Sequence, residues 1–195
     1  MRTLLNGILC LVALSSAAWA QNSDVGLLFG VGAPVNSVGG GQVSSSVSGS
    51  FALTYGAQLR ETRAGQLYLE LPFLSDFHVS DNVGHGTVVS AVRDALFFTP
   101  GARWRFSPAS RVSFYASLGG GLASFGRTRS IVGDGIISNG STRSNTAALA
   151  FGGGLDLRLT RLMSLRFEGR DAVTAAKFDG ASHHTMFLFG VGFHF

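Results

Sequence analysis

The chain has 195 residues, of which 27 are Gly, 16 are Phe and only 13% are charged. Its formal net charge of +4 comes from scattered arginines beside one lysine, Lys177; nucleic-acid-binding proteins instead carry clustered basic residues, so this class is not expected. A mean hydropathy of +0.30, without a later run of about 18 apolar residues, argues against both a soluble domain and a transmembrane helix.

The first predicted element is a secretory signal peptide at residues 1–20. Arg2 supplies its positive charge, residues 4–14 form its apolar segment, and Ala18-Trp19-Ala20 is a small-x-small cleavage site. Cleavage there leaves a single mature domain, residues 21–195. This domain contains no cysteine and therefore needs no disulfide.

Eight segments of the mature domain alternate apolar residues with small or polar ones, which is the period of a β-strand with two unlike faces. The segment 147–159 shows this most clearly. One face carries Ala147, Leu149, Phe151, Leu155, Leu157 and Leu159, and the other carries Ala148, Ala150, Gly152, Gly154, Asp156 and Arg158. The other segments are 24–32, 50–60, 66–73, 96–106, 112–122, 163–170 and 187–195.

The connections between these segments alternate in length. Short hairpin turns are expected at 61–65, 107–110 and 160–162. Loops rich in Gly, Ser, Asn and Asp are expected at 34–47, 75–94, 127–144 and 171–182. Short turns on one side and long loops on the other are typical of outer-membrane barrels, whose short turns are periplasmic.

The apolar face is expected to meet lipid. Only helices and closed barrels satisfy every backbone group inside a membrane, and the second face is too rich in Gly, Ala and Ser to be a solvent-facing surface. We therefore predict an all-β, eight-stranded, antiparallel up-and-down transmembrane β-barrel, present as a monomer. The alternative is a soluble periplasmic ligand-binding barrel with the apolar face inward.

The polar face should then place charged side chains in the lumen. The predicted network consists of Glu70, Arg103, Arg105, Asp156, Arg158, Arg166, Glu168 and Arg170. Inside a narrow barrel these charges must pair, because an unpaired buried charge is costly. Eight strands leave little bore, so we predict a side-chain plug; the alternative is a narrow ion channel.

At this point the chain resembles the small outer-membrane β-barrel proteins, the group that contains the outer-membrane protein A transmembrane domain and the opacity-type surface proteins. The resemblance covers the mature chain and is most specific at its end, Phe187-Leu188-Phe189-Gly190-Val191-Gly192-Phe193-His194-Phe195. It implies that Phe187, Phe189, Val191, Phe193 and Phe195 form the signal read by the barrel-assembly machinery. It also implies an outer-membrane location and a structural or surface-interaction role.

Some barrels that the chain resembles are enzymes, which leaves an outer-leaflet lipid A-modifying enzyme as an alternative. The candidate residues are His183, His184, Thr185, Ser182 and Asp171. Their spacing does not require a nucleophile beside a base, so the chain is expected to be a non-enzyme.

Neither a metal nor a cofactor is expected. The histidines His78, His85, His183 and His184 lie on separate predicted loops without ligand spacing. Expected partners are outer-membrane lipid and lipopolysaccharide. Arg127, Arg129 and Arg143 are the candidate contacts with lipopolysaccharide phosphates, which suit the guanidinium group.

Overall fold

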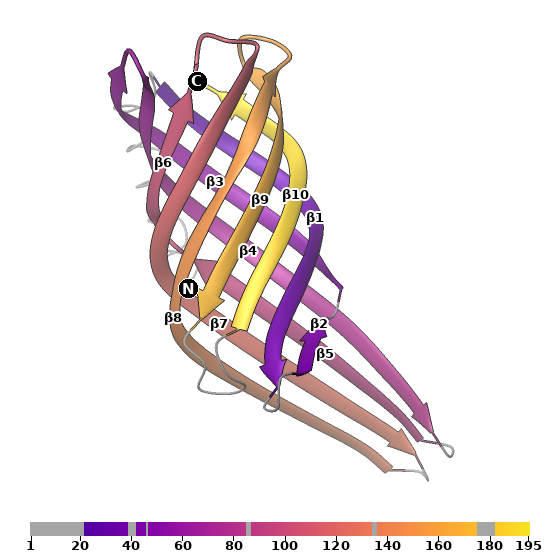
Figure 1. The fold of residues 1–195 in the computed structure, drawn as a ribbon. Coiled ribbons are helices and arrows are strands. Elements are labelled where there is room, and N and C mark those ends of the chain that lie inside the picture. Colours follow the sequence, from indigo (N-terminus) through magenta and orange to yellow (C-terminus); the bar gives the residue numbers. More distant parts are fainter. Residues whose placement is uncertain (1–21, 39–41, 46, 85–86, 134–135, 175–181) are drawn as a thin grey trace, which may run out of the picture.

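The computed structural model describes residues 22–38, 42–45, 47–84, 87–133, 136–174 and 182–195 (Figure 1). The predicted signal peptide lies outside these residues. Ten strands are present: β1 (Ser23–Val38), β2 (Gln42–Ser45), β3 (Ser48–Thr62), β4 (Gly65–Gly84), β5 (Thr87–Phe98), β6 (Gly101–Phe106), β7 (Val112–Gly133), β8 (Ile136–Arg158), β9 (Met163–Thr174) and β10 (Ser182–His194). In the described part of the chain, no helix has the length and hydropathy to cross a membrane.

The ten strands build a closed ring of eight. Both β5 and β6 pair with β4 on one side and β7 on the other, so they are two parts of one wall strand. The break falls at Thr99 and Pro100, where proline has no backbone N–H to donate and Gly120 N–H donates to the Pro100 carbonyl at 3.1 Å. The short strand β2 pairs with the end of β1.

Closure of the ring comes from β1 and β10, which pair from Asp24 opposite His194 to Asn36 opposite Ser182. Every other wall strand pairs with its sequence neighbours in antiparallel register. The predicted fold, an eight-stranded antiparallel up-and-down β-barrel, is therefore confirmed. In Figure 1 the strands cross the barrel at a tilt, as closure of a sheet requires.

The three predicted short turns lie at one end of the barrel, together with the end of β10 (top of Figure 1). The turn between β3 and β4 uses Gly65 at a φ of 151°, which few side chains tolerate. Thr62 Oγ1 donates to the Gly65 carbonyl at 3.0 Å and fixes this turn. We call this end of the barrel the short-turn end.

The opposite end differs from the prediction, because most of the expected loop residues are in strands. β4 continues to Gly84 and β5 begins at Thr87, while β7 continues to Gly133 and β8 begins at Ile136. In the expected loop 34–47, β1 runs on to pair with β2. Of the expected loop 171–182, β9 takes the residues up to Thr174 and β10 begins at Ser182.

Two of these hairpins extend beyond the barrel wall. β3 pairs with β4 only as far as Gly49 opposite Phe77, and β9 pairs with β8 only as far as Thr174 opposite Ala148. Beyond these pairs β4, β5, β7 and β8 continue as a sheet at the lower right of Figure 1. We call this the projecting sheet: β4 after Phe77, β5 before Ala95, β7 after Phe125 and β8 before Ala148.

The outer surface of the barrel is apolar. Phe114, Leu118, Phe187 and Phe189 are 57%, 59%, 62% and 62% exposed, and aromatic or aliphatic side chains on the other wall strands are exposed in the same way. A monomeric soluble protein rarely exposes so large an apolar surface, whereas a transmembrane barrel presents this face to lipid. The faces are thus oriented as predicted, and opposite to those of a soluble barrel.

Candidate functional site

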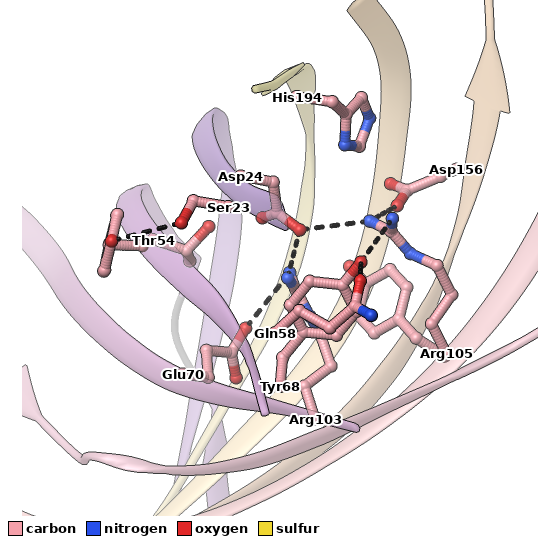
Figure 2. A network of polar contacts seen from close by, with 12 residues as sticks. Ser23, Asp24, Thr54, Gln58, Tyr68, Glu70, Arg103, Arg105, Asp156 and His194 are labelled. Carbon is pink, nitrogen blue, oxygen red and sulfur yellow. Dashed lines mark hydrogen bonds and ion pairs between the residues drawn. The ribbon is translucent and has the colours of Figure 1, made fainter. Parts of the chain in front are cut away.

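The short-turn half of the lumen contains a buried network of charged side chains (Figure 2). Its members are Asp24 on β1, Glu70 on β4, Arg103 and Arg105 on β6, Asp156 on β8, and Arg166, Glu168 and Arg170 on β9, and each is at most 4% exposed. Four arginines face four carboxylates, so the formal charges of this set cancel. Because the members come from five strands around the ring, their contacts cross the bore.

Asp24 is the centre of the first group of contacts. Its carboxylate forms ion pairs with Arg103, with Arg105 at 3.2 Å and with Arg166 at 3.4 Å. Gly56 makes room for these contacts, because a Cβ atom there would meet the Arg103 guanidinium. Figure 2 shows the Arg105 guanidinium between Asp24 and Asp156, with dashed lines to both carboxylates.

Asp156 completes this first group. It binds Arg105 NH2 at 2.7 Å and Arg166 Nε at 2.7 Å. Each of these arginines therefore bridges two carboxylates, which is how a buried charge avoids an uncompensated desolvation cost.

A second group lies around Arg170. Its guanidinium binds Glu70 Oε2 at 3.0 Å and Glu168 Oε1 at 2.5 Å, and Tyr115 donates its hydroxyl to Glu168 at 2.7 Å. Arg103 NH1 lies 3.6 Å from Glu70 and so links the two groups.

Two tyrosine rings cover the arginines between these groups. The Arg103 guanidinium carbon lies 4.9 Å from the Tyr68 ring centroid and 5.6 Å from that of Tyr115. Arg166 lies 5.4 Å from the Tyr115 ring. Arg103 Nε has no hydrogen-bond acceptor among the described residues, and these cation–π contacts offset part of that deficit.

Seven of the eight residues predicted for the lumen lie together in this network, and Arg158 does not. Arg158 is exposed at the short-turn end, where its NH2 donates to the Pro108 carbonyl at 2.9 Å. Arg158 lies two residues after Asp156 and so shares its face of β8. At the rim of the barrel, however, a side chain on this face reaches solvent. The predicted set also omitted Asp24, which alternation places on the polar face of β1.

An apolar layer lies next to the network on the side of the projecting sheet. Its members are Leu28, Ala52, Leu74, Ala95, Phe97, Ala123, Ala148, Ala150, Ala172, Met186 and Leu188. The network and this layer fill the barrel in succession along its axis.

The adjacent histidines His183 and His184 point in opposite directions. The His184 ring is buried inside the barrel between Phe97 and Phe125, at centroid distances of 5.1 and 5.3 Å, with Nδ1 3.8 Å from Asp76 Oδ2. His183 lies on the outer surface, where its Nδ1 is 2.7 Å from Asp171 Oδ2. The two rings therefore do not form one site.

Among the candidates with described side chains, His183, His184, Thr185 and Asp171, no hydrolase-like triad is formed. The Thr185 hydroxyl donates to Asp171 Oδ1 at 3.3 Å and makes no hydrogen bond to a histidine of the described residues, whereas a nucleophile must touch its base. The side chains of Ser182 and His78 and all of His85 lie outside the described parts. In the described part of the chain, no group of three metal-ligating side chains occurs.

The three candidate lipopolysaccharide contacts belong to the projecting sheet, where Arg127 and Arg143 occupy opposite faces. Arg127 is opposite Arg93 in the β5–β7 register and Arg129 is opposite Ala91. Arg143 is opposite Gly126 and reaches Asp94 at 3.5 Å across that glycine. Because directions alternate along a strand, Arg127 follows the inward direction of Phe125, whereas Arg143 follows the outward direction of Leu149.

The C-terminal segment forms the closing strand. Phe187, Phe189, Phe193 and Phe195 are exposed on the outer surface at 62%, 62%, 40% and 61%. Phe195 N–H donates to the Ser23 carbonyl at 2.9 Å, so the last residue is tied to the first wall strand. The role of this segment as an assembly signal stays a prediction.

Comparison with known proteins gives the same fold. The model of the family described as "Outer membrane protein beta-barrel domain" matches residues 7–195. The structure of Ail, the attachment invasion locus protein of Yersinia pestis, in complex with the heparin analogue sucrose octasulfate is 14% identical with a TM-score of 0.57, and the match covers 90% of this chain and 100% of that chain. The outer-membrane protease OmpT of Escherichia coli is 7% identical with a TM-score of 0.55, covering 90% and 97%.

Neisserial surface protein A is 14% identical with a TM-score of 0.50, covering 88% of this chain and 97% of that chain. Identities this low show a shared fold alone. No curated protein sequence matches the chain significantly.

Proposed function

Because the chain belongs to the outer-membrane β-barrel family and is thus a protein of the outer membrane, we propose that it acts at the cell surface through its projecting sheet. The barrel itself stays sealed. In this proposal the chain is neither a channel nor an enzyme. The leader directs export and is then cleaved, and insertion follows recognition of the C-terminal segment by the barrel-assembly machinery. The inserted protein is a monomer.

The filled lumen supports a sealed barrel. Ion pairs of the charge network cross the bore, and the adjacent apolar layer contains side chains such as Leu28, Leu74 and Phe97 at 0% exposure. An ion would have to separate buried pairs and then cross apolar side chains, and both steps are costly. The small bore of an eight-stranded barrel agrees with this.

The projecting sheet supports a surface role. In barrels of this class short turns face the periplasm and longer connections face outward. The short-turn end, with both ends of the wall, is then periplasmic, and the projecting sheet stands outside the cell. A long paired sheet holds its side chains in fixed register, as a recognition surface requires.

The placement of arginines on this sheet carries the proposal and indicates an anionic partner. Arg93 and Arg127 occupy directly opposed positions, an arrangement that destabilises a sheet unless an anion lies nearby. Arg129 follows two residues after Arg127 in the same strand, at the register position opposite Ala91. Guanidinium groups bind sulfate and phosphate in a bidentate manner, so the proposed partner is a sulfated or phosphorylated glycan. Ail was solved with a heparin analogue, which supports this choice for a similar fold.

Arg143 favours a second contact, with lipopolysaccharide. It lies on the outward face of the same strands, 63% exposed and only loosely paired with Asp94. This face continues the lipid-facing wall, and lipopolysaccharide surrounds a barrel on that side. The inward face carrying Arg127 looks over the barrel mouth, where a soluble glycan has access.

One experiment with two ligands tests both contacts. The folded mature chain in neutral detergent is titrated with a heparin oligosaccharide and with lipopolysaccharide. Replacing Arg127 and Arg129 with Gln should weaken heparin binding about tenfold, the loss of at least one charge-assisted hydrogen bond, and leave lipopolysaccharide binding unchanged. R143Q should weaken lipopolysaccharide binding and leave heparin binding unchanged. The double variant R60Q/R63Q removes two charges at the short-turn end and should change neither.

Unchanged heparin binding in R127Q/R129Q, or an equal loss in R60Q/R63Q, would contradict the glycan proposal. Unchanged lipopolysaccharide binding in R143Q would remove the second contact. In every case the faster migration of unboiled protein on a gel verifies that the barrel is folded.

A further inference from the structure

Three hydrogen-bonded polar side chains lie on the outer surface of the wall, away from the lumen and the projecting sheet. They are Asp171 on β9 and His183 and Thr185 on β10. His183 Nδ1 is 2.7 Å from Asp171 Oδ2, and Thr185 Oγ1 donates to Asp171 Oδ1 at 3.3 Å. Thr185 is directly opposite Asp171 and His183 is opposite Val173, so all three share one face. We call them the outer triplet.

The surroundings of the outer triplet are apolar. Phe187 follows Thr185 on the same face and is 62% exposed, while Phe151 stands opposite Asp171 on β8 and is 44% exposed. Leu149, two residues before Phe151 on β8, is 51% exposed. The Asp171 carboxylate therefore lies at the edge of the lipid-facing surface, close to the end that carries the projecting sheet.

An ionisable group on the lipid-facing side of a barrel costs free energy and marks a functional position. The cost falls toward the membrane interface, which is where the end of the apolar surface places Asp171. Among the described side chains, Asp171 bonds only to His183 and Thr185. The environment that the group faces is lipid.

The geometry leaves one ring nitrogen available to that lipid. Asp171 is only 16% exposed and holds the His183 ring at Nδ1, whereas His183 is 49% exposed. No hydrogen bond to Nε2 is present among the described residues. A protonated imidazole donates from both ring nitrogens, so it can bridge the Asp171 carboxylate and a second anion. At this depth the available anion is a lipid phosphate.

We propose that the outer triplet is a binding site for the phosphate group of an outer-leaflet lipid, with His183 Nε2 as the contacting atom. Asp171 is a positioning residue that fixes the ring, and Thr185 fixes the Asp171 carboxylate. Binding is favoured over hydrolysis because the Thr185 hydroxyl donates to Asp171 instead of contacting the ring, so no nucleophile rests on a base.

The test uses the folded mature chain in neutral detergent, titrated with diphosphoryl lipid A and followed by native mass spectrometry. H183N should weaken binding about tenfold, the effect of losing a charge-assisted hydrogen bond. H183K, which supplies a cationic N–H donor at this position, should bind within about threefold of the unmodified chain. H184N is the matched control, because its ring lies inside the barrel between Phe97 and Phe125, and it should bind normally.

Equal binding of lipid A by H183N and the unmodified chain would overturn the proposal, and so would an equal loss in H184N. Equal binding of dephosphorylated lipid A would show that phosphate is not recognised, and equally tight binding of inorganic phosphate would show that the lipid is not. Release of fatty acid from lipid A that stops in H183N would replace the binding site with a hydrolytic one. The outcome is independent of heparin binding by R127Q/R129Q, so the two proposals fail separately.

Discussion

Asp24 shows how a single carboxylate organises the lumen. It contacts three arginines from two strands, Arg103, Arg105 and Arg166, and it is 1% exposed. In contrast, Asp94 on the projecting sheet contacts one exposed arginine at 3.5 Å. Removal of a buried partner leaves uncompensated charge, whereas removal of an exposed one is nearly neutral.

D24N should therefore lower the free energy of unfolding by about 3 kcal/mol. The measurement is a urea titration of the folded chain in lipid vesicles, read from the fraction that keeps the mobility of the unboiled form. D94N is the control and should change this free energy by less than about 1 kcal/mol. Similar midpoints for the two variants would mean that Asp24 does not hold the network together.

At the scale of the residue, the sequence predicts whether a side chain points into the lumen or outward better than it predicts its ion-pair partners. Alternation placed seven of the eight predicted charges in the lumen correctly, because inward and outward positions simply alternate. It could not show that Arg158 lies at the rim, since that depends on where the wall ends. Nor could it select Asp24, whose importance comes from arginines far away in the chain.

At the scale of the element, the strands of the wall can be predicted from the sequence more easily than those of the projecting sheet. A wall strand meets lipid on one side and a crowded lumen on the other, and this contrast produces a clear period of two. In the projecting sheet both faces lie beyond the lipid and the filled lumen, so the contrast is lost. The segments 75–94 and 127–144 therefore resembled loops in composition although most of their residues are paired.

Because the wall ends before the projecting sheet begins, the two should be separable. Replacing residues 128–141 with a two-residue turn should leave the mobility shift between boiled and unboiled protein intact, since the wall pairs from Val112 to Phe125 remain. Binding of the heparin oligosaccharide should weaken but persist, because Arg129 is removed while the opposed Arg93 and Arg127 remain. Loss of the mobility shift would show that the hairpin is needed to complete the barrel.

At the scale of the molecule, the succession of a charge network and an apolar layer determines what the barrel can transport. Both lie inside one closed wall, so they obstruct the same path in series. Fully buried side chains in each part, such as Arg103 and Phe97, support the proposal that the barrel is sealed. A conducting barrel of this size would need one of these two parts to be absent.

The purified chain in a planar lipid bilayer should consequently give no discrete conductance steps in 1 M salt at neutral pH, a condition that screens exposed charges but affects buried pairs much less. Insertion is verified in the same preparation by protection of the barrel from added protease. Regular conductance steps from protein that is purified to a single gel band would contradict the sealed barrel and favour the narrow channel.

The sequence separation of the network partners has a consequence for assembly. Asp24 and Arg166 are 142 residues apart, on the first and the last but one strand of the wall. A sheet that has not closed would expose charged members of this network to whatever surrounds it, and lipid is the least favourable solvent for them. We therefore expect the filling of the interior and the joining of the two ends to occur together.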